Sequence, residues 1–114
     1  MAETVATETN TRLTINLGRS TRIPEGQGRC YVVGPNEIAV FRQRDGRVFA
    51  TENRCPHRQG PLAEGVLGGG RIICPLHGHQ FNLETGAGSE PAECVRVFPV
   101  QEIAGDMLLS LNGK

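Results

Sequence analysis

Two pairs of cysteine and histidine residues are the candidates for metal chemistry in this sequence. Cys55 lies two positions before His57, and Cys74 lies three positions before His77. Sixteen residues, 58–73, separate the two pairs. Thiol and imidazole side chains clustered at such close spacing are typical of metal sites. The sequence therefore predicts a metal centre with these two cysteines and two histidines as ligands.

Zinc is one metal that accepts two thiolates and two imidazoles, so a zinc-binding structural or interaction module is one interpretation. The spacing disfavours it, because structural zinc sites usually place two cysteines only a few residues apart. Each pair here joins unlike residues instead, and the connection between the pairs is rich in glycine without a helical pattern. In a Rieske iron–sulfur cluster, thiolates hold one iron and imidazoles hold the other, which explains mixed pairs directly.

The segment from Cys55 to Gly78 resembles the fingerprint of Rieske [2Fe–2S] proteins. Flanking pieces agree with it, namely Ile23-Pro24-Glu25-Gly26, residues 37–42 and Gly60-Pro61-Leu62. They resemble soluble Rieske ferredoxins, and they are more similar still to the Rieske-like small subunit of NAD(P)H-dependent assimilatory nitrite reductase. The similarity runs from about residue 13 to residue 111. It implies one [2Fe–2S] cluster held by the two pairs described above.

The resemblance implies one-electron transfer and a redox protein as partner. The chain has no nucleophile–base pair and no phosphate-binding glycine loop, so we do not expect it to be a complete enzyme alone. In one setting it is the small subunit of a nitrite reductase, next to a large subunit with flavin and siroheme. In the other it is a free ferredoxin between a reductase and a ring-hydroxylating oxygenase. The flanking similarities favour the nitrite reductase setting.

The composition describes a small, glycine-rich chain without net charge. Its 114 residues include 15 glycines and 7 prolines, 38% are hydrophobic, and 12 basic residues balance 12 acidic ones. This length fits a single domain, whose small core a bound metal centre stabilises further. Zero net charge disfavours nucleic-acid binding, which needs a basic face. The chain has no apolar run of membrane-spanning length and no signal-peptide pattern, so we expect a cytoplasmic protein without membrane contact.

Alternating apolar residues predict strands, and no stretch shows a sustained helical period. Leu13, Ile15 and Leu17 alternate with polar residues, and Asp45-Gly46 is typical of a hairpin turn. The strands that we expect lie at residues 13–17, 29–33, 37–42, 47–51, 71–73, 80–83, 95–100 and 107–111, the last two forming a hairpin that turns at Gly105-Asp106. With the resemblance, they predict an all-β fold, a Rieske-type antiparallel sandwich or barrel with a small inserted cluster-binding subdomain.

The domain boundaries follow from the same pattern. We expect a disordered tail over residues 1–10, since nothing in it can be buried, and a single Rieske domain over residues 11–114. The cluster-binding subdomain occupies about residues 53–83, with residues 61–70 as the connection between its ligand segments. By resemblance, residues 86–91 hold the position of a proline-bearing loop that covers the cluster.

Cys30 and Cys94 remain outside the ligand pairs. A disulfide between them would be typical of a secreted protein. Both flank strand-like segments, where a thiol usually acts as a small buried hydrophobic group. We prefer this second interpretation and expect a reducing compartment.

The residues after the second pair bear on the reduction potential. By resemblance, high-potential members carry a serine and a tyrosine that donate to the cluster sulfurs, where this chain has His79 and Phe81. Phenylalanine has no donor, and the donor at position 79 is not a hydroxyl. High-potential members also join their ligand segments by a disulfide, which this chain lacks the cysteines to form. His79 is an alternative ligand to His77, but the spacing of His77 matches the pattern.

We therefore expect a reduction potential in the lower half of the Rieske range, which runs from about −150 to +300 mV. Fewer hydrogen bonds to the sulfurs stabilise the added negative charge less, and this lowers the potential. A redox titration of the purified protein, followed by electron paramagnetic resonance (EPR), measures it. A value near the upper end of the range would contradict the expectation.

Overall fold

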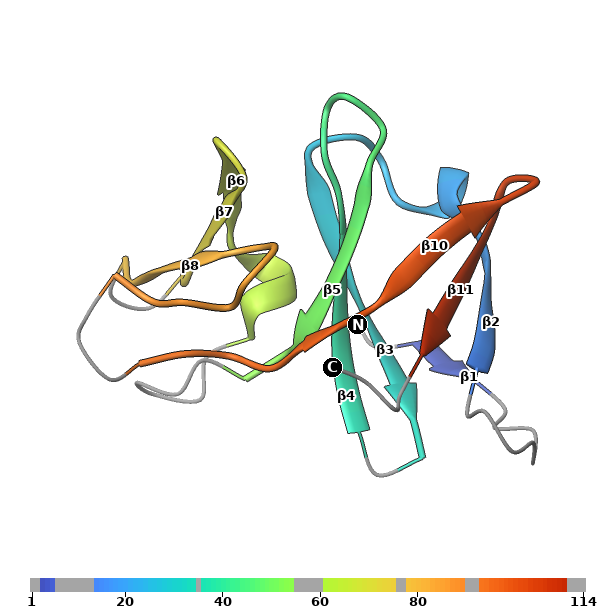
Figure 1. Cartoon of the computed structure of the whole chain (residues 1–114), viewed down its shortest axis with the longest axis horizontal. Helices are drawn as coiled ribbons and strands as arrows, with labels where there is room; N and C mark the ends of the chain where they lie inside the picture. Colours follow the sequence, from blue (N-terminus) through green and yellow to red (C-terminus); the bar gives the residue numbers. More distant parts are fainter. Residues whose placement is uncertain are drawn as a thin grey trace.

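The computed structural model describes residues 3–5, 14–34, 36–54, 61–75, 78–89 and 93–110. Over these ranges the chain forms strands in three sheets, joined by turns and two short 3₁₀ helices (Figure 1). This confirms the all-β fold class that the sequence predicts.

The largest sheet has five strands in the order β1-β3-β4-β5-β9. Their bounds are Glu3–Val5 for β1, Gln27–Val33 for β3, Asn36–Arg42 for β4, Val48–Glu52 for β5 and Val97–Phe98 for β9. All neighbours pair antiparallel except β1, which runs parallel to β3. Because β1 belongs to the tail expected to be disordered, that expectation is wrong for residues 3–5. A free edge of β3 offers backbone groups that even a short extended segment pairs with.

The hairpin of β4 and β5 forms as the sequence predicts. It turns at Asp45-Gly46, where Gly46 has a φ of +94°, a conformation that glycine adopts without strain. The backbone N–H of Arg47 donates to the Asp45 carboxylate at 3.0 Å and lowers the pKa of that side chain. The turn is therefore held by its own residues.

The second sheet has three strands in the order β10-β11-β2, with bounds Val100–Ile103, Asp106–Ser110 and Thr14–Arg19. The single-turn helix η1, Ser20–Arg22, follows β2. Alternation along β2 buries Ile15 and Leu17 and exposes Thr14 and Asn16, as the sequence predicts. This sheet packs face to face on the five-stranded sheet, which gives the expected sandwich.

The strand predicted over residues 95–100 is not continuous. Val97–Phe98 form β9 and pair with β5, whereas β10 begins at Val100 in the other sheet. Pro99 lies between them, and a proline has no N–H to donate to a ladder, so the chain changes sheets there. The hairpin of β10 and β11 then turns at Ala104-Gly105, one residue earlier than predicted.

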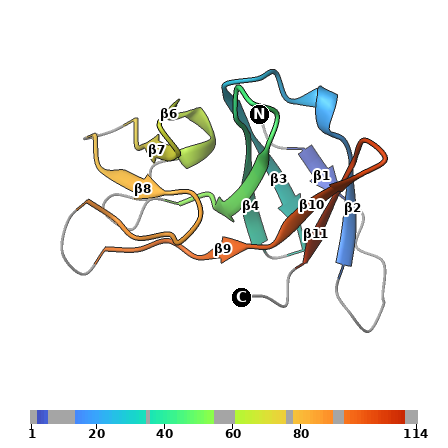
Figure 2. The ribbon, with the colours of Figure 1, turned by 45° about the horizontal axis from the view of Figure 1, so that its top comes forward.

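The third sheet is small and lies apart from the other two (Figure 2). Its strands are Val66–Gly68 for β6, Arg71–Ile73 for β7 and Gln80–Asn82 for β8, in that order. The helix η2, Leu62–Glu64, precedes them. These elements lie inside the range expected for the inserted subdomain. The connection expected over residues 61–70 holds η2 and β6.

Strand β4 is buried on both faces and thereby joins two separate cores. Ile38 and Val40 belong to the core between the five-stranded sheet and the sheet of β10, β11 and β2. Ala39 and Phe41 belong to the core beneath the sheet of β6, β7 and β8. Successive side chains of a strand point to opposite faces, so one strand serves both. The second core is made of Ala39, Phe41, Leu62, Ala63, Ile72, Cys74, Phe81, Leu83 and Val95.

A pair of glycines in the subdomain tests its packing. A methyl group on Gly65 would lie 2.2 Å from the carbonyl oxygen of Ile73, whereas one on Gly68 would meet nothing within 4 Å. We expect Gly65→Ala to lower the free energy of unfolding by about 1–3 kcal/mol, the usual cost of overpacking. Gly68→Ala, the matched control, should change it by less than about 0.5 kcal/mol. Chemical denaturation measures both, and equal effects would contradict the packing.

Candidate metal centre

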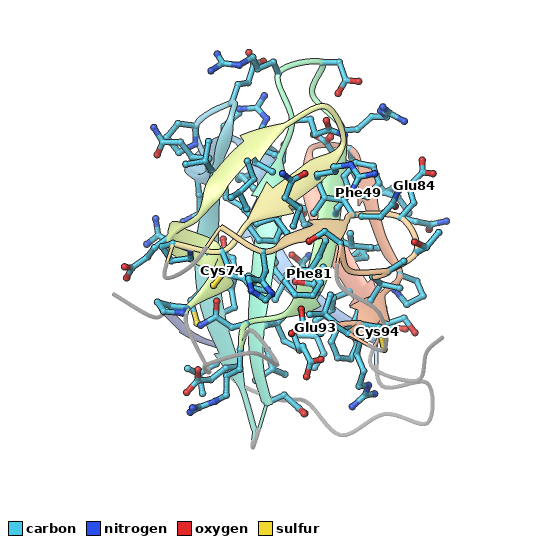
Figure 3. The ribbon with its side chains drawn as sticks, turned by 90° about the vertical axis from the view of Figure 1, so that its left-hand side faces the viewer. Phe49, Cys74, Phe81, Glu84, Glu93 and Cys94 are labelled. Atoms are coloured by element: carbon cyan, nitrogen blue, oxygen red, sulfur yellow. The ribbon has the colours of Figure 1, made fainter. Side chains whose placement is uncertain are left out.

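Of the four predicted ligands, Cys74 lies in the described part of the chain. Cys55, His57 and His77 fall outside the described residues. Cys74 directly follows β7, its side chain is buried, and its thiol is free of any disulfide. Figure 3 views the end of the molecule that carries it, with Phe81 and Glu93 labelled on the same side.

Two backbone hydrogen bonds hold Cys74 at the base of a tight loop. Its N–H donates to the carbonyl of His79 at 2.7 Å, and the N–H of Gly78 donates to the carbonyl of Cys74 at 3.1 Å. Gly78 has a φ of +77°, in the left-handed region that favours glycine. The loop therefore closes between residues 74 and 79, on either side of the predicted ligand at position 77.

The side chain of His79 ties this loop to a distant segment. Its Nδ1 lies 2.8 Å from Oε1 of Glu93, and both side chains are about one-fifth exposed, at 18% and 20%. A hydrogen bond to a carboxylate in such a sheltered place is stronger than one between neutral groups. This contact joins His79, at the end of the second ligand loop, to Glu93.

The segment after β8 folds back along that strand. The N–H of Ser89 donates to the carbonyl of Gln80 at 2.8 Å, and the Ser89 hydroxyl accepts from the N–H of Gln80 at 3.1 Å. The N–H of Gly88 donates to the carbonyl of Glu93 at 2.9 Å. Residues 86–89 therefore lie against the strand that leaves the second ligand loop, where the sequence predicts a covering loop. Pro91 lies outside the described residues.

The first ligand segment is flanked by two paired residues. Arg54, just before Cys55, forms an isolated antiparallel bridge with Pro61. The guanidinium of Arg54 also lies 3.1 Å from Oε2 of Glu37 on β4. The segment between residues 54 and 61 thus starts and ends at one place on the subdomain.

Cys74 and Phe81 share the core that Leu62 and Ile72 also line. The thiolate form of cysteine is the one that binds metals. A thiolate among apolar side chains is costly unless a cation neutralises it, so a metal bound here suits the donor. Phe81 is fully buried and has no donor, in keeping with the expected weak hydrogen bonding at this position.

Cys30 and Cys94 are both free thiols. Cys30 is half-buried and packs against the core of the subdomain, and burial, with the nearby Glu37 carboxylate, raises the pKa of its thiol. Cys94 is exposed, so its interpretation as a buried hydrophobic group is wrong. The strand expected from residue 95 begins only at Val97, and an isolated bridge with Ala87 is the pairing at position 94.

The chain matches the model of the Rieske [2Fe-2S] domain over residues 14–99, which is most of its length. The chain belongs to the Rieske [2Fe–2S] family. Membership implies a Rieske-type [2Fe–2S] cluster and a role in electron transfer, and it favours the iron–sulfur interpretation over the zinc module. No helix among the described residues is long and apolar enough to cross a membrane.

The sequence relatives of this Rieske chain include electron carriers and oxygenases. It is 34% identical to the anthranilate 1,2-dioxygenase ferredoxin subunit of Burkholderia cepacia over 98 residues, which is 84% of this chain and 90% of that one. It is 37% identical to the 4beta-methylsterol monooxygenase of Methylococcus capsulatus over 76 residues, 57% of this chain. The chain spans about a fifth of the length of the first curated relatives, 21% for that monooxygenase.

Solved structures show the same fold. The ferredoxin of carbazole 1,9a-dioxygenase from Nocardioides aromaticivorans superposes with a TM-score of 0.76 at 27% identity, covering 84% of this chain and 95% of that one. A putative NADH-dependent nitrite reductase small subunit from Mycobacterium tuberculosis superposes with a TM-score of 0.83 at 19% identity. This superposition covers 92% of this chain and 100% of that one.

The hydrogen bond between His79 and Glu93 generates a prediction. Glu93→Ala removes the acceptor and so breaks the side-chain link between Glu93 and His79 of the second ligand loop. A hydrogen bond to a charged group contributes about 1.5–3 kcal/mol, so local opening should become roughly tenfold more frequent or more. Hydrogen exchange at the Ser89 amide, and the rate of iron release to a chelator, should rise accordingly.

Glu84→Ala is the matched control. It removes the same charge from a side chain that is 67% exposed and 4.0 Å from its partner Arg47, and such exposed pairs contribute little. We expect exchange and iron release at the rates of the unmodified protein. Equal effects of the two substitutions would contradict a specific role for Glu93.

Proposed function

We propose that this chain is a Rieske ferredoxin that passes single electrons from a reductase to an oxygenase. The observation that carries the proposal is its 34% identity with a dioxygenase ferredoxin subunit over 84% of this chain and 90% of that one. Similarity to three oxygenases, a 4beta-methylsterol monooxygenase, a dicamba O-demethylase and a vanillate O-demethylase, covers only 57–60% of this chain. A match over nearly the whole of a small electron carrier supports that role more than the role of one domain in an oxygenase.

We propose Cys55, His57, Cys74 and His77 as the cluster ligands. Two thiolates and two imidazoles are the donor set of a Rieske cluster. Cys74 supports the assignment by its burial and free thiol. When bound, such a cluster accepts and returns one electron at about −150 to +300 mV.

The residues around Cys74 have supporting tasks in this proposal. The loop closed by the Cys74 and Gly78 amides fixes the backbone that carries the second ligand pair. Phe81, fully buried beside Cys74, keeps water from that side of the site. The hydrogen bond of His79 with Glu93 keeps the following segment against the loop. None of these groups needs to move for an electron to pass.

A nitrite reductase small subunit is the second candidate. The flanking residues 37–42 and 60–62 favour it, and a subunit of this kind shares the fold, with a TM-score of 0.83 over 100% of its chain. At 19% identity, that superposition supports the fold rather than a particular partner. In this setting the redox partner is a large subunit with flavin and siroheme. Both candidates place the protein in a reducing, cytoplasmic compartment, where the free thiols of Cys30 and Cys94 remain reduced.

Partner capture from native lysate tests the two candidates. The tagged, cluster-loaded protein is incubated with lysate, and captured proteins are identified by mass spectrometry. Electron transfer to each purified candidate is then followed by bleaching of the visible cluster absorption. We expect capture of an oxygenase or its reductase, and rapid transfer to the oxygenase.

The outcomes separate the candidates. Capture of a siroheme protein, with electron transfer to it and none to an oxygenase, would replace the first candidate by the second. Cys74→Ser serves as the control in the same assay. Its hydroxyl is a poor ligand for iron, so we expect loss of the visible absorption and of electron transfer to either partner. Unchanged absorption in that variant would contradict the ligand assignment.

A further inference from the structure

Asn53 is a buried polar residue two positions before Cys55. Its side chain is 5% exposed, which makes it one of three buried polar residues in the described part of the chain. Burying an amide costs free energy unless its polar atoms are hydrogen-bonded. The contacts of Asn53 show why a polar side chain is kept there.

Three hydrogen bonds join Asn53 to two other elements. Its Oδ1 accepts from the N–H of Ala63 at 2.9 Å, and its carbonyl accepts from the N–H of Leu62 at 2.7 Å. Its own N–H donates to the carbonyl of Glu37 on β4 at 3.0 Å. One residue therefore binds both the central strand β4 and the helix η2.

The bonds to η2 take the place of a missing cap. The first N–H groups of a helix have no partner within the helix and need an acceptor from elsewhere. Pro61, at the start of η2, makes no side-chain cap. Asn53 accepts from Leu62 and Ala63 instead, from the opposite end of the first ligand segment. The cap of η2 is thus also a clamp across residues 54–61.

The helix η2, which Asn53 caps, also contacts the second ligand segment through the core. Leu62 and Ala63 are buried, and they pack in the same core as Cys74. A shift of η2 therefore changes the place where the first ligand segment ends relative to Cys74. The exposed pair of Arg54 with Glu37 adds little to this, since such surface pairs contribute little free energy.

We propose that Asn53 is the positioning residue for the first ligand pair. By fixing both ends of the segment that carries Cys55 and His57, it sets their position relative to the second pair. The inference rests on the proposed ligands, but not on the identity of any redox partner. It concerns the isolated cluster-loaded protein, so it is tested without an oxygenase or a nitrite reductase.

The test compares three variants of the cluster-loaded protein. Asn53→Ala removes the acceptor for the Ala63 N–H, and Asn53→Asp keeps an accepting oxygen in the same place. Thr51→Val is the matched control. Thr51, on β5, is also a buried polar residue, but its hydroxyl donates to the carbonyl of the adjacent Glu52 at 2.8 Å and not to η2. Each variant is examined by thermal unfolding, by EPR of the reduced cluster and by iron release to a chelator.

We expect Asn53→Ala to release iron at least tenfold faster and to shift or broaden the EPR signal. Asn53→Asp should restore the wild-type signal. Thr51→Val should lower the melting temperature without changing the EPR signal, and its iron release should stay within threefold of wild type. A loss of general stability alone moves the melting temperature but not the EPR signal of the cluster that remains.

Two results would overturn the inference. One is a wild-type EPR signal and wild-type iron release in Asn53→Ala, and the other is the same change in Thr51→Val as in Asn53→Ala. Failure of the proposed function would look different. A wild-type protein that transfers no electron to an oxygenase, with an EPR shift confined to Asn53→Ala, rejects the ferredoxin role and supports the positioning role.

Discussion

The structure depends on one constraint. Two ligand segments that are separated in sequence must be held at fixed positions relative to each other in a very small domain. The strand β4 meets this constraint by being buried on both faces. Ile38 and Val40 anchor it in the core between the large sheets, and Ala39 and Phe41 anchor the small sheet to it. Because a strand alternates its side chains, four consecutive residues connect the two cores. The subdomain is thus anchored to the sandwich through β4.

Hydrogen bonds add to the apolar core of the subdomain. Its strands have three residues each, so their ladders are short. Backbone bonds at Cys74, Gly78 and Ser89 and side-chain bonds at Asn53 and Glu93 supplement them. Each of these bonds restrains a segment next to a predicted ligand. This is the arrangement expected where the supporting contacts, more than the ligands, decide how well a site keeps its geometry.

Periodicity and turn chemistry carried the fold prediction, because they are local properties. The alternation of Ile15 and Leu17 and the Asp45-Gly46 turn each depend on neighbouring residues, and both were confirmed. The break at Pro99 could have been predicted, since a proline inside a strand pattern argues against a continuous strand. The roles of Asn53 and Glu93 could not be predicted from the sequence, because their partners lie ten and fourteen positions away. A side chain that caps or braces a distant segment leaves no periodic pattern in the sequence.

The comparisons explain why the partner is harder to infer than the cofactor. A dioxygenase ferredoxin and a nitrite reductase small subunit share this fold at 27% and 19% identity. A fold common to carriers with different names fixes what the domain holds, but not what it touches. In the proposed arrangement the ligand pairs, β4 and the hydrogen bonds around Cys74 serve the cluster, a need that carriers of this kind share. Partner choice must therefore depend on residues that do none of this work, namely the exposed side chains around the ligand segments, where charge and shape decide which protein docks.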